Sequence, residues 1–377
     1  MGLGETFSLK KALVLAGAII AMVIGTGFAT GQELIQYYTS YGIWVLGAVA
    51  VFAVVFIFYN ICFAKVGAEQ HFERGTDVYR YYCGRYLGTF FDYYATAFCY
   101  MSFFVMAGGV SSTLSQGFGL PTWVGGALLA CVVISVVCLG LRRLVDVIGI
   151  IGPANIVFFI TVGVIVLVID WQQLAGGLDA INTGSLNGDT SGEGMVQAGG
   201  NWFMAGLSYA GFVLLWFASF TTLLGAQNTR ANMKVGIVIA AVAISVAIII
   251  VSLAQIANIN TGSEGLFVWN APIPNLILAD RIWAGLPVIY AVVVFIGGCG
   301  TSIPLLYNSV SRLAKEGTVR FRVLAVVGGI AGVCIGLFFP YSTLVNVVYG
   351  LNGYVGAVLL VFMIVRSIRD ALERRHG

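Results

Sequence analysis

Two adjacent hydroxyl residues, Thr301 and Ser302, follow the glycine-rich stretch Gly297-Gly298-Cys299-Gly300. On a helix, positions 298, 301 and 302 share one face, because residues three and four apart are neighbours. Two hydroxyls and a carbonyl freed by the glycines would form a site of hard oxygen ligands, which small cations prefer. The hydroxyls can instead donate to carbonyls of the preceding turn. Both interpretations are open on this pattern alone.

A second polar pattern interrupts the first apolar run. Gly25-Thr26-Gly27-Phe28-Ala29-Thr30-Gly31 follows an apolar stretch that ends at Ile24. Three glycines in seven residues destabilise a helix. Irregular backbone at bilayer depth occurs where it lines a cavity or is buried in protein. We therefore expect a broken helix here; close helix packing through small residues is the alternative.

Gln32 and Glu33 come directly after this break, and Glu33 is the most deeply placed carboxylate of the chain. Thr30 and Glu33 have the spacing of a capping box, in which Thr30 caps a new helix and Glu33 bonds back to the Thr30 amide. An acid inside a membrane can also couple transport to a proton or cation. The two roles are compatible.

A third pattern, Ser208-Tyr209-Ala210-Gly211, interrupts a later apolar run about a third of the way in. This predicts a second broken helix, five spans after the first. Two five-span halves, 12–169 and 200–365, would then have opposite topology. Paired interrupted segments of this kind point to a transporter site near the middle of the membrane. No similarity of residues between the halves supports the repeat, which is inferred from topology alone.

Residues for enzyme catalysis are scarce. The two histidines, His71 and His376, lie in charged segments, and the seven cysteines lie in or beside apolar runs without metal-ligand spacing. With 59% apolar and 9% charged residues, the composition excludes an ordinary soluble enzyme, a disordered chain and a nucleic-acid binder. We expect neither an enzyme nor an organic cofactor.

The elements that position these patterns are membrane-spanning helices of about 20 apolar residues each. Ten segments qualify, all within a single domain of residues 1–377: 12–40, 42–64, 87–114, 121–141, 144–169, 200–225, 233–256, 284–309, 323–340 and 343–365. Of the 19 basic residues, all but Arg281 fall on one side of this arrangement. The excess of basic residues marks the cytoplasmic side, so both termini are expected there. Residues 67–86 are expected to form a short amphipathic helix on that surface, and 171–199 and 257–283 to lie outside.

Ten spans, the Gly25-Thr26-Gly27 break, the interruption in the sixth span and the Thr301-Ser302 pair resemble the amino acid–polyamine–organocation superfamily. That superfamily has the LeuT-type fold of two inverted five-helix repeats with helices 1 and 6 discontinuous. The stretch from Gly27 to Glu33 is similar, more narrowly, to the bacterial YkvI-like membrane proteins. The resemblance covers essentially the whole chain.

The resemblance implies a sodium site between helices 1 and 8. Carried onto this chain, its ligands are the carbonyls of Ala21, Ile24 and Gly298 and the hydroxyls of Thr301 and Ser302. Phe28 stands where sodium-coupled relatives have an asparagine, so a second sodium is not expected.

The resemblance also implies a substrate site against the two breaks. It would comprise the backbone from Gly25 to Phe28 and the residues from Ser208 to Gly211, with Tyr100 and Phe104 of the third span as walls. Trp202, Phe203 and Phe212 are candidate lids.

Sodium-coupled symport of a small amphipathic solute, such as an amino acid, by alternating access is the function that the resemblance implies. A proton-coupled symporter of a similar solute and a non-transporting nutrient sensor on the same scaffold are the alternatives. The expected partners are the solute and the lipid bilayer, with no nucleic acid. The expected location is the bacterial cytoplasmic membrane.

Overall fold

The protein is almost entirely helical. A computed structural model describes residues 7–72, 74–139, 141–189 and 194–376, and the only strands in that part form a short hairpin, β1 Gly262–Ser263 with β2 Leu266–Phe267. The long helices are α4 Val45–Gln70, α5 Asp77–Phe118, α6 Thr122–Leu139, α7 Leu141–Ile169, α9 Trp202–Gln227, α10 Arg230–Ala257, α12 Leu286–Ser311, α13 Val319–Phe338 and α15 Gly350–His376.

Eight helical segments in the described residues are long and apolar enough to cross a membrane. A further candidate is the pair Ala154–Ile169 and Trp171–Thr183, which is bent by 73°. The chain is therefore a multi-pass membrane protein. The first predicted span, 12–40, consists of three short helices, none of which has this length alone, and the count of ten spans stays a prediction.

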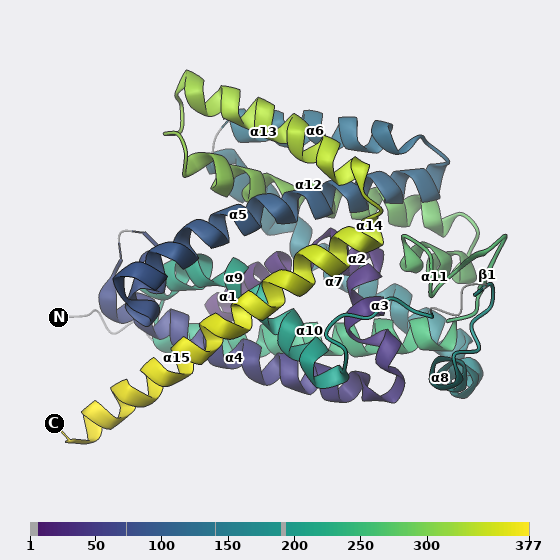
Figure 1. The fold of residues 1–377 in the computed structure, drawn as a ribbon, viewed down its shortest axis with the longest axis horizontal. Coiled ribbons are helices and arrows are strands. Elements are labelled where there is room, and N and C mark those ends of the chain that lie inside the picture. Colours follow the sequence, from purple (N-terminus) through teal and green to yellow (C-terminus); the bar gives the residue numbers. More distant parts are fainter. Residues whose placement is uncertain (1–6, 73, 140, 190–193, 377) are drawn as a thin grey trace.

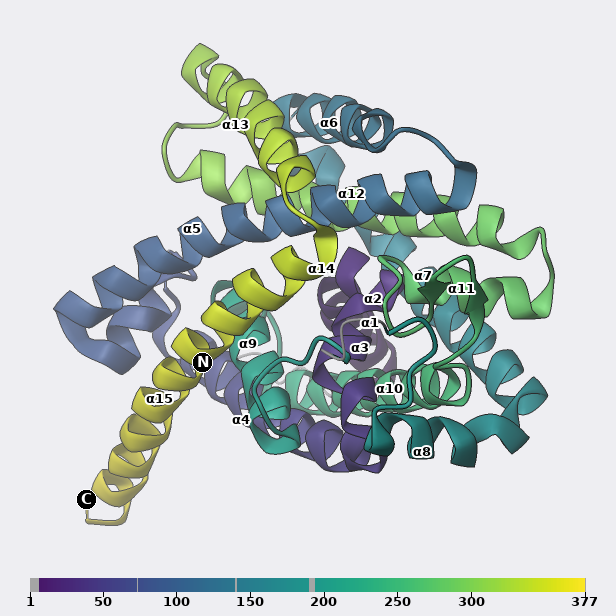
Figure 2. The same ribbon diagram turned by 45° about the vertical axis from the view of Figure 1, so that its right-hand side comes forward.

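The long helices form two groups (Figure 1). In one group α5, α6, α12 and α13 pack on one another; in the other, α1 (Leu9–Val23), α4, α9 and α10 do so. The later pieces of the first span stand between the two groups: α2 (Thr26–Thr30) contacts α5 and α12, and α3 (Gln32–Tyr37) contacts α9 and α10 (Figure 2). The first span is thus placed where a relative movement of the groups would act on it.

The second group is held together by the close approach of α4 and α9. Phe52, Phe56, Tyr59 and Phe63 recur at helical spacing along α4 and are buried. Phe52 packs edge-on against Tyr209 of α9, with ring centroids 5.3 Å apart. Inside a membrane no hydrophobic effect drives helices together, so this packing depends on the close fit of the two helix surfaces.

The connections between spans carry structure of their own. One end of the molecule has α8 (Leu174–Thr183), the β-hairpin and α11 (Pro274–Ile282), and the C-terminal end of α15 lies at the other (Figure 1). Between α13 and α15 the chain forms the short helix α14 (Tyr341–Leu344) and a π-helical turn, η3 (Val345–Tyr349).

The amphipathic helix expected at 67–86 is divided between neighbouring elements. α4 continues to Gln70, and α5 begins at Asp77 but leaves helical geometry at Gly84, where φ is 74°. Asp77–Cys83 therefore forms a separate helical piece before the long part of α5. The basic side chains at 142–143 and 374–375, used to predict orientation, lie outside the described side chains.

Candidate functional site at the broken first span

The first span is interrupted between α1 and α2 (Thr26–Thr30). α1 ends at Val23, and the amide of Gly25 donates to the carbonyl of Val23 at 2.9 Å. In a continuous helix that amide would bond to Ala21. The Ala21 carbonyl therefore loses the helical donor it would otherwise have, as carbonyls do at helix ends. The carbonyl of Ile24 lies in the break itself.

α12 lies directly against this interruption. A Cβ atom placed on Gly25 would lie 3.1 Å from Oγ1 of Thr301, and one on Gly298 would lie 2.7 Å from Oγ1 of Thr26. The glycines thus let the backbones of the two helices approach closely. Of the expected sodium ligands, Gly298 and Thr301 of α12 lie against Thr26 and Gly25, at the break that follows α1.

Two hydroxyls at this junction have no hydrogen-bond partner. They are Oγ1 of Thr26 and Oγ of Ser302, and both side chains are buried. Thr301, by contrast, donates to the carbonyl of Gly297 at 3.1 Å, the back-bonding considered above. A buried hydroxyl without a hydrogen-bond partner costs free energy unless a water or an ion pairs with it.

The donor chemistry suits a small hard cation. The oxygens near the break are neutral hydroxyls and carbonyls, which bind hard ions. Within the described residues, no group of three or more His, Cys, Asp or Glu side chains has the arrangement of a metal site.

The first span is interrupted a second time at Gly31, between α2 and α3 (Gln32–Tyr37). Gly31 has φ 88°, and a Cβ there would lie 2.4 Å from Oδ1 of Asn275. Asn275 donates to the carbonyl of Ala29 at 3.1 Å, and Gln255 donates to that of Gly31 at 3.2 Å. Tyr290 also donates to the Ala29 carbonyl, at 2.7 Å. Side chains of α10, α11 and α12 therefore satisfy the carbonyls of this second interruption.

The capping box predicted for Thr30 and Glu33 is wrong. The residue that precedes α3 is Gly31, and of the two bonds of a capping box only one has a counterpart, a hydrogen bond of 3.4 Å that the Gln32 amide donates to the Thr30 hydroxyl. Thr30 ends α2, and its hydroxyl bonds to the Gly27 carbonyl and to the Tyr341 hydroxyl, each at 2.9 Å. The left-handed glycine turns the chain, so Glu33 points away from the Thr30 amide and towards α9.

Glu33 instead joins three helices. Its Oε2 accepts a hydrogen bond of 2.8 Å from the hydroxyl of Tyr209 on α9. Its Oε1 lies against Gly27 of α2, where a Cβ would be only 1.7 Å away. Gln32 bonds to the carbonyl of Ala271 and to Gln36. The acid is thus part of the junction between the first span and α9.

The predicted interruption of the sixth span is also wrong. α9 is continuous from Trp202 to Gln227. The small residues serve close packing: a Cβ on Gly211 would lie 2.2 Å from the Gly353 carbonyl of α15, and one on Gly353 would lie 2.0 Å from Oγ of Ser208. Ser208 and Gly211 therefore face α15, and of this group Tyr209 reaches the broken span. Ala210 is fully buried.

Tyr100 and Phe104 are not walls of a site at the breaks. The Tyr100 hydroxyl donates to the carbonyl of Gly328 on α13 at 2.8 Å, and the two rings pack on each other. From α5 it is Gly109 and Val110 that approach Thr26 and Gly298. The prediction chose the wrong face of this helix because aromatic residues occur on both.

The three candidate lids have different surroundings. Trp202 stacks on Trp44, with ring centroids 5.2 Å apart, and Phe203 is 48% exposed. Phe212 is fully buried and stacks on Tyr349 of η3 at 4.6 Å. Phe212 is therefore an interior packing residue.

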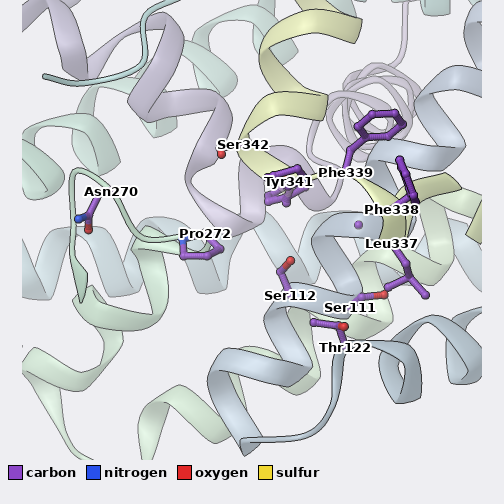
Figure 3. A pocket seen from close by; sticks show the side chains of 13 residues that line it. Ser111, Ser112, Thr122, Asn270, Pro272, Leu337, Phe338, Phe339, Tyr341 and Ser342 are labelled. Carbon is purple, nitrogen blue, oxygen red and sulfur yellow. The ribbon is translucent and has the colours of Figure 1, made fainter. Parts of the chain in front are cut away.

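A cavity of about 330 Å³ lies between the second half of α5, the end of α13 and α14 (Figure 3). Ser111, Ser112, Thr122 and Ser342 supply polar groups to it, and Tyr341 forms part of its wall. A Cβ atom on Gly109 would touch both Tyr341 and Thr26. The Tyr341 ring therefore separates this cavity from the broken span.

Tyr341, Asn275 and Gln255 contact the first span but were not predicted. Asn275 follows Pro274 in a segment predicted to lie outside the membrane. Tyr341 follows Pro340, just before the last predicted span. A buried glutamine in an apolar run, as at Gln255, was the available signal.

α11 is fixed by an ion pair outside the spans. Arg281 bonds to the carboxylate of Asp170 through Nη2 at 2.6 Å and Nε at 3.1 Å. This guanidinium lowers the pKa of Asp170, whose carboxylate in turn raises the pKa of Arg281. The pair holds the helix that presents Asn275 to the first span.

Known proteins similar to this chain are transporters. MhsT, solved in complex with L-phenylalanine, superposes with a TM-score of 0.62 at 13% identity, over 96% of this chain and 90% of MhsT. A variant of the Eremococcus coleocola manganese transporter gives 0.60 at 15% identity, over 97% of this chain and 80% of the transporter. The protein has the LeuT fold.

The LeuT fold was the fold predicted from the sequence, and the prediction is confirmed. The model of the sodium:alanine symporter family matches residues 67–213, from the end of α4 into α9. A comparison with proteins of curated function found no match. The matched family and both similar LeuT-fold structures are transporters, in agreement with the prediction that the chain is not an enzyme.

Proposed function

We propose that this protein is a secondary active transporter that couples the movement of a small amphipathic solute to sodium. The observation that carries the proposal is the contact between the interrupted first span and α12. There Gly25 lies against Thr301 and Thr26 lies against Gly298, and the proposed ligands are the carbonyls of Ala21, Ile24 and Gly298 and the hydroxyls of Thr301 and Ser302. These residues would hold sodium, which supplies the driving free energy.

The solute would bind beside this ion, against Gly25, Thr26, Gly27 and Phe28. Thr26 offers a buried hydroxyl without a protein partner. On α5, Gly109 lies against Thr26, and Val110 lies against Gly298. An amino acid or related zwitterion fits the proposal, since the sodium:alanine symporter model matches part of the chain and MhsT was solved with L-phenylalanine.

Alternating access would proceed by movement of the two helix groups about the first span. The interruptions before Thr26 and at Gly31 divide that span into three pieces, which can change direction separately. Tyr341 would then govern passage between the solute site and the cavity beside it. With a cytoplasmic-membrane location and both termini in the cytoplasm, this cavity would lie towards the outside.

Uptake by purified protein in liposomes tests the proposal. A panel of radiolabelled amino acids is offered with an inward sodium gradient, and with potassium in its place as the control. We expect uptake of at least one amino acid in sodium and little in potassium. Equal uptake in both would contradict sodium coupling and leave the proton-coupled alternative. Binding without counterflow of any panel member would favour the nutrient sensor.

A further inference from the structure

Glu33 is a buried carboxylate without a positive partner. Its side chain is 2% exposed, and Tyr209 donates a hydrogen bond to it. The ion pairs found in the described residues involve other acids, and no Lys, Arg or His in that part of the chain pairs with Glu33. Glu33 is absent from the five expected sodium ligands, and its contacts lie on α2 and α9.

The groups that face Glu33 are neutral. The titratable residues within electrostatic range are Tyr37 and Tyr38 of the first span, Tyr209 of α9, Tyr341 of α14 and Tyr349 of η3. The hydroxyls of Tyr38 and Tyr349 have no hydrogen-bond partner. A charge on Glu33 would polarise these phenol groups, but they would not neutralise it.

An ionised carboxylate in such surroundings carries a large desolvation cost, so it takes up a proton or a cation. The close packing around the two carboxylate oxygens favours a proton over a larger cation. Oε1 is packed against the α-carbon of Gly27, and Tyr209 covers Oε2. The rings of Tyr37 and Tyr38 close around Tyr209, with centroids 5.4 and 5.2 Å from its own.

We propose that Glu33 is a proton-binding site, separate from the sodium site, whose occupancy controls the strength of the hydrogen bond between the first span and α9. This inference rests on the proposed transport function for its role, but its chemistry can be measured without transport. The proton enters from water when the site opens and returns to water when it opens again, so no other reactant is needed.

The proton changes the strength of the contact that Glu33 makes. A hydrogen bond from Tyr209 to a carboxylate is charge-assisted and roughly twice as strong as one to a neutral carboxyl group. Protonation therefore weakens the bond between the first span and α9 while removing the cost of the buried charge. The arrangement closed around Glu33 therefore favours the protonated acid.

Infrared spectroscopy of the purified protein tests the site directly. A protonated carboxyl group has a carbonyl band that a carboxylate lacks. At neutral pH we expect this band in the wild type, its loss in Glu33→Gln, and its retention in Glu373→Gln, which removes an exposed acid of the C-terminal helix paired with Arg369. Identical spectra for wild type and Glu33→Gln in this region at every pH would overturn the proposal.

A second variant tests the same site in case Glu33→Gln fails to fold. Tyr209→Phe keeps the carboxyl group and removes its hydrogen-bond donor, so the band should move to higher frequency. An unmoved band would overturn the proposal. If instead no solute is transported under any gradient, the symport function fails while the infrared result on Glu33 still stands.

Discussion

Ser302 is the side chain on which the proposed sodium site depends most. Its hydroxyl is buried without a hydrogen-bond partner, one position after Thr301, which lies against Gly25 in the break of the first span. Thr301 differs, because its hydroxyl already donates to Gly297. A sodium ion would pair with the oxygen of Ser302 and could bind the oxygen of Thr301 without breaking the bond that Thr301 donates.

Ser302→Ala should separate ion binding from packing. The hydroxyl it removes has no partner, so stability in potassium should stay the same or rise slightly. In sodium, the loss of one oxygen ligand should weaken affinity about tenfold, equivalent to about 1.4 kcal/mol. The measurement is the unfolding temperature of wild type and variant, titrated with each cation.

Ser309→Ala provides the matched control on the same helix. Its hydroxyl donates to Leu305 at 2.8 Å and lies two turns from the site. Its loss should lower stability equally in sodium and potassium. A sodium response of Ser302→Ala as large as that of the wild type would remove Ser302 from the ligand set.

The elements show that similar sequence patterns can have opposite structural outcomes. Glycines interrupt the first span, whereas Ser208 to Gly211 lie in an unbroken helix. At Gly31 the backbone is left-handed and its carbonyl has a partner, Gln255, from another helix. At Gly211 the backbone stays helical, and the missing side chain lets α15 approach it closely. The local pattern does not specify which of the two roles a glycine takes.

Gly31→Ala should be strongly destabilising. The left-handed conformation costs a residue with a Cβ about 1–2 kcal/mol, and this Cβ would also collide with Asn275 and Gln255. We expect a total loss of more than about 2 kcal/mol, since the collision adds to that cost. Thermal unfolding of the purified protein measures it.

Gly119→Ala is the control for conformation alone. Gly119 has φ 67°, and a Cβ added there would meet no atom within 4 Å, so only the left-handed conformation should cost stability. Equal losses for the two variants would mean that the packing of Asn275 and Gln255 around Gly31 contributes nothing.

At the scale of the whole molecule, the membrane class and the interruption of the first span follow from local composition, whereas the LeuT fold was predicted from the resemblance to a known superfamily. Three glycines in an apolar run are visible in a short window of the sequence. The partner of Glu33 is not, because Tyr209 lies 176 positions away and reaches it only when α9 packs on α3. The orientation of Tyr100 towards Gly328 is equally a product of tertiary packing. Contacts between helices that are distant in the sequence therefore had to come from the structure.

The linkers outside the spans give the molecule a stability term that depends on pH. The Asp170 carboxylate, 2% exposed, is ionised against Arg281, and this partner lowers the pKa of Asp170 in the folded state. In the unfolded chain an aspartate titrates near about pH 3.9, so the pair stabilises the fold above about pH 4. The contribution is lost as the pH falls through the lower, folded pKa, because the protonated acid no longer attracts the guanidinium.

Asp170→Asn should therefore destabilise the protein at neutral pH by about 2 kcal/mol, the scale of hydrogen bonds to a charged group. The difference from the wild type should shrink as the pH is lowered below about 4, where the wild-type carboxylate also loses its charge. Unfolding temperatures across this range, with Glu373→Gln as an exposed ion-pair control, provide the measurement. A difference that is independent of pH would show that Asp170 acts through shape and not through charge.

Because the pair fixes α11, the same variant should also loosen Asn275 from the Ala29 carbonyl. Hydrogen exchange in α2 and α3 should then rise at neutral pH together with the loss of stability.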